Sequence, residues 1–559
     1  MCNTLKAIFI LFILSQNLYS QLLNKEYKNL VPKNRPRYQA KISLDFEDRS
    51  FKGEEKISFE YPFANNKGVF LRLFANSGTY YGKNLSIVSV KMDGTDLRFD
   101  YRDNTTIEIK GDFRPRKRYT IDIEFQATLP EISDEDADIF LLSLKQLLGL
   151  STKRMSENNY GVFGCSSTVC NMASPIPTLA KISGDDWNIS EINGLGDYQR
   201  GDFADYHVSI ISDPSVVVIT NGIVKKSEKL PDGRIISHFE AEVVNDFVIE
   251  ASDVFKSVSK EIDNVLYTSY YTSEIEYSVA ELSIEIASQA INYFSKYYAK
   301  YPYTTLKIVS APMTGGAGGV EFPALITVGN FLYSGVQFAQ PEGRFTTKDL
   351  LSQMFEFVIV HEVAHQWFST LVPSDSRREP FLDEGLASFS AYLYFMNKYG
   401  EQEGKKFLEN HIRLNYIVMR LLGYKDLPIS TPIDKYDNMF QYAGIIYGKA
   451  PLFFVKLNEI LGDLRMMHLL SSWVRERAFK DSEMRHLISM LKKSEQKKVD
   501  QIESLYKRWF EGTYGDEDIG KGSLNELLKL LNEGEDFDIN LNKFKDWLED
   551  TFDMFRQYR

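Results

Sequence analysis

Two histidines four residues apart, His361 and His365, constrain this chain more than any other feature. Apolar residues recur at three- and four-residue steps over residues 350–371, and no proline or glycine interrupts them before Pro373, so the pattern predicts a helix. At about 3.6 residues per turn, both imidazoles project from nearly the same face and can contact one ion. Two neutral imidazole nitrogens suit zinc.

A third zinc ligand is predicted further along the chain. Glu384 follows His365 after eighteen intervening residues, within a second helical pattern, FLDEGLASFSAYLYF. Three protein ligands leave a fourth position for water, as in catalytic zinc sites, and we expect one Zn²⁺ per chain. Glu362 points about 100° around the helix from His361, so it can act on that water as a general base. The alternative is an ordinary amphipathic helix, but with only seven histidines in the chain an accidental motif is improbable.

Composition bounds the class of protein. The chain has 559 residues, of which 43% are hydrophobic and 25% charged, and this is typical of a globular protein with about two to four domains. The net charge of -12 argues against a nucleic-acid partner, and no cluster of Lys and Arg with interleaved aromatics reverses this locally.

The first twenty residues indicate export. Lys6 precedes an unbroken apolar run at residues 7–14, which is too short to span a bilayer, where about twenty residues are needed. We therefore expect a signal peptide cleaved near Ser20 and a periplasmic, extracellular or surface-associated protein, with an uncleaved N-terminal anchor as the alternative. No later segment is apolar and long enough to cross a membrane, so no transmembrane span is expected in the mature chain.

The cysteines leave two alternatives open. Cys2 precedes the apolar run and would leave with the signal peptide, so Cys165 and Cys170 remain. An oxidising compartment and their five-residue separation favour a disulfide, whereas two buried free thiols are the alternative.

The periodicity of the chain changes near residue 255. Residues 21–255 contain short alternating apolar segments separated by turns such as Asp93-Gly94, which predicts an N-terminal all-β sandwich. Residues 256–515 mix strands with long helical patterns and carry the zinc motif, and residues 516–559 are expected to form a short helical C-terminal segment. The predicted fold is therefore multidomain, with an irregular region at residues 134–198 that includes a helical stretch at residues 139–150.

A glycine-rich segment, TGGAGGVEF, lies upstream of the zinc motif. Gly318 and Gly319 lack a Cβ and so let the backbone pass close to a ligand, and Glu321 follows after a single valine. The alternative is a flexible turn with a solvated acid.

Several separated segments together resemble one family, the gluzincin aminopeptidases typified by alanyl aminopeptidase and leukotriene hydrolase. The zinc signature of that family is matched by His361, Glu362, His365 and Glu384 without a gap. The family's Gly-x-Met-Glu-Asn motif is similar to residues 318–323, with Val for Met and Phe for Asn, and residues 446–450 resemble the segment around its catalytic tyrosine. The resemblance covers about residues 205–515.

The resemblance implies a thermolysin-like α+β catalytic domain and hydrolysis of N-terminal residues from peptides that have a free N-terminus. In that chemistry Glu362 moves the proton of the attacking water, and Tyr447 donates a hydrogen bond to the oxyanion. Glu321 pairs with the substrate ammonium, and Tyr442 resembles a second tyrosine near the metal in some relatives. For both tyrosines, packing in the core is the alternative. Asp383 either orients a ligand or belongs only to the first turn of its helix.

Two departures from the family pattern limit what is implied. Many relatives hold the substrate amine with a polar residue of the β-rich domain, and none can be placed around residues 165–171. Many also have a large helical C-terminal domain, whereas only about a hundred residues follow Ile460. The cleft is then either more open or covered by a second subunit in a homo-oligomer.

Three functional hypotheses compete. The favoured one is an exported zinc aminopeptidase. The second keeps the same zinc site in an endopeptidase or an epoxide hydrolase. The third is a non-catalytic peptide-binding protein, against which the retention of all three ligands and Glu362 argues.

Overall fold

The computed structural model describes residues 21–77, 84–132, 160–190, 192, 195–197, 200–315, 317–338, 347–523 and 526. The predicted signal peptide at residues 1–20 and the predicted helix at residues 139–150 lie outside the described residues. So does most of the predicted tail at residues 516–559.

The first half of the chain is built around a sheet of eight strands among the described residues, in the order β16-β17-β14-β1-β2-β8-β4-β5. In β8 alternate side chains are buried, as expected where one face of a sheet covers a core. β1 pairs antiparallel with β2 and parallel with β14. The strands are β1 (Arg37–Asp45), β2 (Ser50–Glu60), β4 (Leu85–Met92), β5 (Thr95–Asp96), β8 (Arg118–Thr128), β14 (Ala204–Ser212), β16 (Ile223–Lys229) and β17 (Ile235–Val244).

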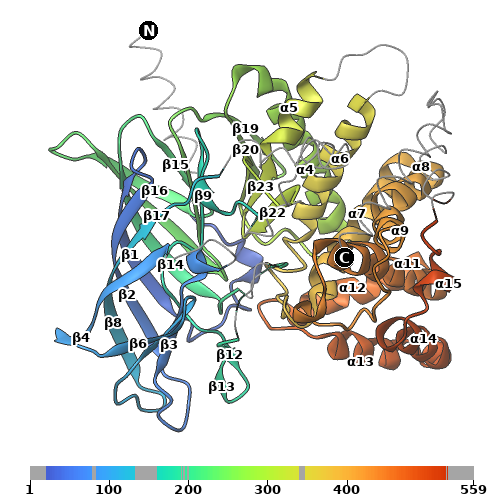
Figure 1. Ribbon diagram of the computed structural model, residues 1–559, viewed down its shortest axis with the longest axis horizontal. Coiled ribbons are helices and arrows are strands. Elements are labelled where there is room, and N and C mark those ends of the chain that lie inside the picture. The colour runs from blue at the N-terminus through green and yellow to red at the C-terminus, as the bar shows by residue number, and fades with distance from the viewer. Residues whose placement is uncertain are drawn as a thin grey trace.

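Smaller sheets pack on this large sheet. The ring centroids of Phe51 in β2 and Phe163 in β9 lie 6.5 Å apart, and those of Tyr206 in β14 and Phe247 lie 5.4 Å apart. The strand orders of these smaller sheets are β15-β18-β10-β9, β11-β3-β7-β6 and β12-β13. The strands are β3 (Val69–Arg72), β6 (Phe99–Asp103), β7 (Thr106–Ile109), β9 (Phe163–Cys165), β10 (Cys170–Ala173), β11 (Thr178–Leu179), β12 (Ile182–Ser183), β13 (Asp186–Trp187), β15 (Val217–Thr220) and β18 (Val248–Ser252). The first half is therefore β-rich and layered, as predicted (Figure 1).

The next strands form a separate sheet, in the order β19-β20-β21-β23-β22. β20, β21 and β23 run parallel, whereas β22 is antiparallel to β23. A capping box between Ser273 and Glu276 precedes the long helix that follows β20. The elements are β19 (Lys256–Ile262), β20 (Val265–Tyr271), α4 (Tyr277–Tyr297), β21 (Thr305–Ala311), β22 (Gly319–Phe322), β23 (Leu325–Gly329), α5 (Asn330–Phe338) and α6 (Thr347–Ala364).

Beyond α6 the described chain is helical, and Figure 1 shows these helices gathered at the end of the molecule opposite the large sheet. The helices are α7 (Leu386–Tyr399), α8 (Glu401–Phe407), α9 (Leu414–Leu421), α10 (Met439–Tyr442), α11 (Ala450–Leu461), α12 (Asp463–Arg477), α13 (Met484–Ser494), α14 (Val499–Tyr506) and α15 (Gly515–Asp518). The chain thus has a sheet-rich first part and a helical last part, which confirms the predicted multidomain architecture.

The helix that carries the histidines is shorter than predicted. The pattern predicted a helix over residues 350–371, but α6 ends at Ala364 and turns follow. The Gln366 side chain accepts from Ala324 N at 3.0 Å and donates to Phe322 O at 3.0 Å, and Trp367 Nε1 donates to Ala299 O at 2.8 Å. These bonds tie the residues after His365 to neighbouring elements, which periodicity alone does not reveal.

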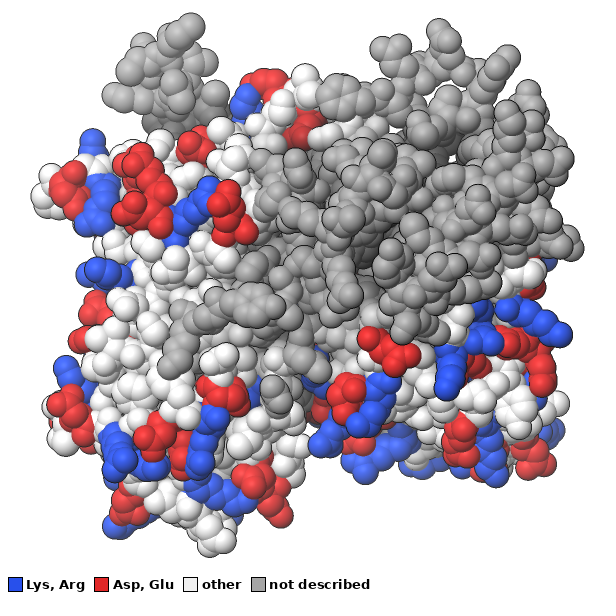
Figure 2. All heavy atoms as spheres, viewed as in Figure 1, with Lys and Arg blue, Asp and Glu red and all other residues white. Residues whose placement is uncertain are grey.

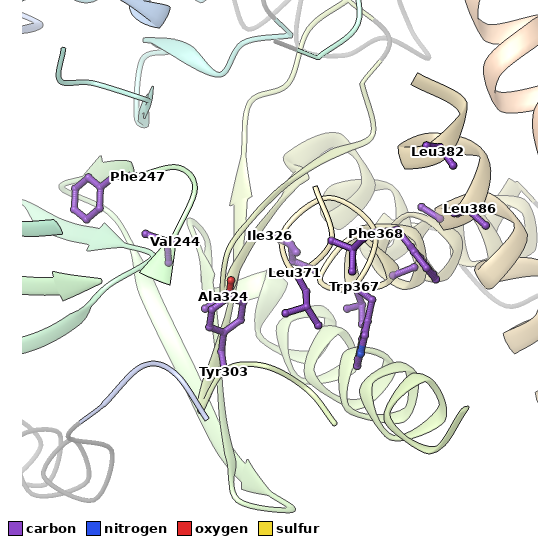
Figure 3. Packing of buried hydrophobic residues seen from close by; sticks show 14 of the residues in the cluster. Val244, Phe247, Tyr303, Ala324, Ile326, Trp367, Phe368, Leu371, Leu382 and Leu386 are labelled. Atoms are coloured by element: carbon purple, nitrogen blue, oxygen red, sulfur yellow. The ribbon is translucent and has the colours of Figure 1, made fainter. Parts of the chain in front are cut away.

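One hydrophobic core joins the two halves. The residues labelled in Figure 3 run from Val244 and Phe247 of the β-rich half, across Ala324 and Ile326, to the turns after α6. Trp367 is fully buried, and its ring lies 5.6 Å from that of Phe294 in α4. The turns after α6 are therefore held from several sides.

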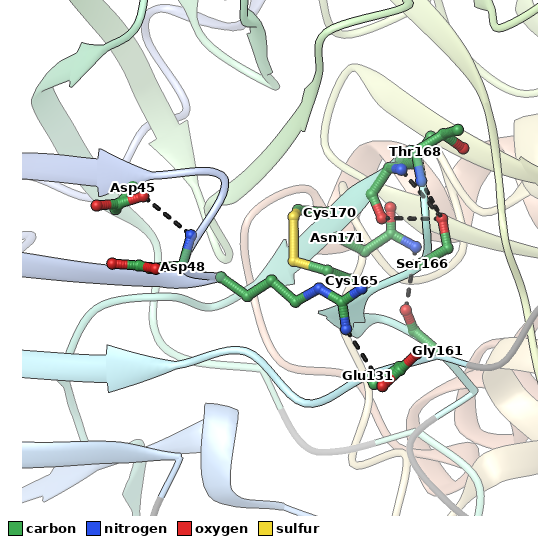
Figure 4. Close-up of a disulfide and its surroundings, with 11 residues drawn as sticks. Asp45, Asp48, Glu131, Gly161, Cys165, Ser166, Thr168, Cys170 and Asn171 are labelled. Atoms are coloured by element: carbon green, nitrogen blue, oxygen red, sulfur yellow. Dashed lines mark hydrogen bonds and ion pairs between the residues drawn. A yellow bond between two sulfur atoms is a disulfide. The ribbon is translucent and has the colours of Figure 1, made fainter.

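Cys165 and Cys170 form a disulfide (Figure 4). They are paired residues at the ends of β9 and β10, whose strands are adjacent and antiparallel. Asn171 in β10 donates to Gly161 O at 3.0 Å and to Pro312 O at 3.1 Å, so this hairpin contacts the chain that follows β21. Of the two alternatives left open for these cysteines, the bonded pair is the one found.

The described part of the face in Figure 2 shows Lys and Arg interspersed with Asp and Glu. In this part of the face, acidic and basic side chains are therefore mixed and do not form a large patch of one sign. Within the described ranges, none of the helices combines the length and the apolar character that a membrane span needs.

Candidate active site

His361 lies in the last turn of α6, and His365 follows directly after that helix. Both side chains are buried, and their Nε2 atoms lie 3.0 Å apart. A hydrogen bond from His365 N to His361 O at 3.2 Å continues the helical turn, which keeps both imidazoles on one face.

Glu384 reaches the same point from a π-helical segment, Phe381–Gly385, that leads into α7. Its Oε2 lies 3.0 Å from His361 Nε2 and 3.4 Å from His365 Nε2. Ligands at about 2.0–2.1 Å from a tetrahedral ion lie about 3.3 Å from one another, so these three atoms fit a single zinc ion.

The outer nitrogens of both imidazoles have partners. His361 Nδ1 lies 3.3 Å from Ser388 Oγ, and His365 Nδ1 lies 3.0 Å from Phe368 O and 2.8 Å from Asp383 Oδ1. Such contacts fix the orientation of a metal-binding imidazole and leave its Nε2 lone pair for the ion. Asp383 thus lies where the ligand-orienting alternative expects it.

Glu362 is buried beside these groups. Its Oε2 has no hydrogen-bond partner among the described residues, and burial raises the pKa of the carboxyl well above its usual range. A Cβ built on Gly319 would lie 2.7 Å from Glu362 Oε1, and a Cβ on Gly318 would lie 2.8 Å from Val358 Cγ2. The two glycines therefore make room for α6, a structural requirement that the sequence did not predict.

Glu321 lies in β22, close to His365 of the candidate zinc site. Its Oε1 accepts from Arg200 Nη2 at 2.8 Å and from Ser369 Oγ at 2.8 Å, and it lies 4.0 Å from His365 Nδ1. Burial is the largest influence on this carboxyl and raises its pKa, but the charges of Arg200 and His365 together outweigh burial and lower the pKa. Glu321 is therefore held as a carboxylate.

Tyr447 lies in a second π-helical segment, Ala443–Lys449. Its ring centroid is 6.1 Å from that of His361 and 5.9 Å from that of Tyr442. Burial raises the pKa of Tyr447 well above its usual range, so its hydroxyl keeps the proton that a hydrogen-bond donor needs. Tyr442 is 1% exposed and also contacts the Tyr436 ring. This environment agrees with the alternative that Tyr442 packs in the core.

Sequence reasoning missed Arg200 and Ser369. Arg200 precedes β14 in the β-rich half and is 121 residues from Glu321 along the chain, and Ser369 lies in the turns after α6. Asp197 also belongs to this region, because an oxygen of its carboxylate lies within 4.8 Å of oxygens of Glu321 and Asp383. No sequence motif marks these residues.

The fold and the site together define a class of protein. It has a β-rich part followed by a mostly helical part, and two histidines and a glutamate are placed as the ligands of a zinc ion. Residues 282–509 match the Peptidase family M1 domain. This match and the aminopeptidase relatives support a relationship to the gluzincin aminopeptidase family.

Two aminopeptidases are among the proteins similar to this chain in sequence. The chain is 23% identical over 467 residues to Aminopeptidase 2 of Candida albicans, covering 81% of this chain and 45% of the relative. It is 28% identical over 195 residues to human Glutamyl aminopeptidase, covering 34% of this chain and 19% of that protein. The chain therefore spans less than half the length of these relatives.

The fold is similar to the crystal structure of a mutant M1 zinc metallopeptidase from Deinococcus radiodurans. The TM-score is 0.56 at 13% sequence identity, and the match covers 86% of this chain and 96% of that chain. This likeness concerns the fold.

Proposed function

We propose that this chain is a zinc-dependent aminopeptidase that removes N-terminal residues from peptides. The observation that carries the proposal is the convergence of His361, His365 and Glu384 to within 3.0–3.4 Å, beside the buried carboxyls of Glu362 and Glu321. The first three residues would hold the metal, and the other two supply the acid–base group and the amine anchor.

Each residue has a defined task in this chemistry. Zinc, when bound by the triad, supplies a Lewis acid toward water and toward the substrate carbonyl. Glu362 takes the proton of the attacking water and passes it to the leaving amine, a role that suits a buried carboxyl with an oxygen within 4.8 Å of a His365 nitrogen. Tyr447 donates its phenolic hydrogen to the oxyanion.

Recognition of the free N-terminus rests on Glu321. An ammonium group that binds a buried carboxylate is fixed both by charge and by hydrogen bonds. This contact sets the distance from the substrate's end to the scissile bond, so that a single residue is removed. Gly318 and Gly319 line the approach, and Tyr442 supports the Tyr447 ring.

The test is hydrolysis of a panel of aminoacyl arylamides. We expect activity that a chelator abolishes and Zn²⁺ restores. Glu321→Ala should lower kcat/KM by at least about 30-fold, because it removes one partner of a buried charge pair. Glu55→Ala is the matched control, since Glu55 in β2 is a similarly buried carboxyl, 2% exposed.

The outcomes separate the alternatives. Unchanged activity of Glu321→Ala would refute its role as amine anchor and favour an endopeptidase or an epoxide hydrolase. Zinc-replete protein that is inert on the whole panel would favour a peptide-binding protein.

Export and domain limits belong to the same proposal. Residues 1–20 direct export, and the Cys165–Cys170 disulfide suits the oxidising compartment that export reaches. The mature chain then divides into a β-rich domain at residues 21–255 and a catalytic domain at residues 256–515, since β18 and β19 belong to different sheets. N-terminal sequencing of the exported protein tests the cleavage near Ser20.

A further inference from the structure

Arg200 brings a charged side chain from the β-rich half into the candidate active site. Its side chain is 11% exposed. Nη1 donates to Ser369 Oγ at 2.7 Å, and Nη2 donates to Glu321 O at 2.5 Å and to Glu321 Oε1 at 2.8 Å. One guanidinium thus binds the backbone and the carboxylate of the same residue.

Ser369 closes this network from the other side. Its Oγ donates to Glu321 Oε1 at 2.8 Å, so two donors hold one carboxylate oxygen. Ser369 has a φ of 140°, a conformation that non-glycine residues adopt only when their surroundings hold them. Asn245 of the β-rich half donates to Ser369 O at 3.3 Å, so both Arg200 and Asn245 hold this turn.

The surroundings of this hydrogen-bond network contain more carboxyl groups than cationic groups, which favours binding of a cation. Carboxyl groups of Asp197, Glu321, Glu362, Asp383 and Glu384 gather here, and Arg200 offsets part of their negative charge. The hydrogen bonds of Arg200 and Ser369 converge on Oε1 of Glu321, which fixes the rotamer of the carboxylate and orients its second oxygen.

We propose that Arg200 is a positioning residue for substrate binding, which together with Ser369 holds Glu321 in the orientation that receives the substrate ammonium. This inference rests on the proposed function, because it assigns Arg200 a task only through Glu321. Recognition of the peptide end is then built by both halves of the chain, although the amine contacts Glu321 alone.

The experiment uses the full-length, zinc-loaded protein and two zinc-binding inhibitors. One is the aminoacyl hydroxamate that matches the best arylamide substrate, and the other is acetohydroxamate, which has no amine. In Arg200→Met we expect KM for the arylamide and Ki for the aminoacyl hydroxamate to rise about tenfold or more. Zinc content and Ki for acetohydroxamate should stay within about twofold, because the metal ligands are untouched.

Two further variants make the test specific. Arg200→Lys keeps the charge but not the fork of donors, so it should restore binding only in part. Lys181→Met is the control, because Lys181 Nζ binds Asp481 Oδ1 at 2.5 Å and so also joins the two halves, away from Glu321. Its side chain is 7% exposed, and its removal should change neither KM nor either Ki by more than about twofold.

A double-mutant cycle with Glu321→Gln decides whether Arg200 acts through Glu321. We expect Arg200→Met to add less than about twofold to the effect of Glu321→Gln. If Glu321→Gln itself has no effect, the proposed amine anchor fails. If Glu321→Gln weakens binding while Arg200→Met does not, or if the two effects multiply, only the positioning role is overturned. Should Arg200→Met not fold, Ser369→Ala removes the other donor to Oε1 and must raise the same two constants for the inference to stand.

Discussion

Replacing Gly319 with alanine tests how closely the glycine-rich strand is fitted to Glu362, the proposed general base. The added Cβ would lie 2.7 Å from Oε1, 2.8 Å from Cγ and 2.9 Å from Cδ of Glu362. Contacts this short are not tolerated, so the carboxyl group must move. To regain an ordinary contact of 3.4 Å, Oε1 would have to recede by about 0.7 Å.

The magnitude follows from that displacement. A general base contributes about 10²–10⁴ to the rate, and a misplacement near 1 Å costs about 10², so we expect kcat to fall about 100-fold. Overpacking should lower the free energy of unfolding by about 1–3 kcal/mol. The bound zinc should remain at one ion per chain, because no metal ligand is among the three atoms nearest to the added Cβ.

The assay compares kcat, zinc content and urea unfolding for Gly319→Ala and Gly53→Ala. A Cβ on Gly53 would lie 2.3 Å from Phe125 Cζ in the β-rich half, so this control is also overpacked but is far from Glu362 in the fold. We expect Gly53→Ala to lose stability and keep its kcat. A Gly319→Ala enzyme with wild-type kcat would refute the assignment of Glu362 as the base that this strand positions.

Two further predictions concern Tyr447 and Glu250. Tyr447→Phe should lower kcat about 10²–10³-fold without loss of zinc, because it removes one donor to the oxyanion, and an unchanged kcat would exclude that role. Burial raises the pKa of Glu250 to about 7, so the folded state holds this proton more tightly than the unfolded state. The free energy of unfolding should therefore decrease by up to about 3 kcal/mol as pH rises through about 4.5 to 7, and Glu250→Gln should abolish that decrease. Urea unfolding at about pH 5 and about pH 8 measures the difference, and equal pH dependence of both proteins would contradict the prediction.

The periodicity of the sequence was enough to predict the two-part architecture. Alternating apolar residues predicted the β-rich half, and the helical period placed His361 and His365 on one face, where the structure brings their Nε2 atoms within 3.0 Å. Both features depend on neighbours in the chain, which a sequence pattern records directly.

Contacts between distant segments could not be predicted in this way. The predicted helix ran seven residues too far, to residue 371, because Gln366 and Trp367 bind elements that no local pattern reveals. Arg200 was missed because its partner Glu321 lies 121 residues away. Gly319 was predicted to admit a ligand, whereas the structure shows that it also admits the side chain of Glu362.

The two π-helical segments that carry Glu384 and Tyr447 have a geometric consequence. Each wide turn holds one residue more than regular α-helical geometry needs, and such insertions are rare and frequently lie at functional sites. Deleting that residue would restore regular helical geometry but would turn the side chain of Glu384 or Tyr447 away from its partners. Regular helical geometry and the placement of Glu384 and Tyr447 are therefore in conflict, and at both positions the chain keeps the placement.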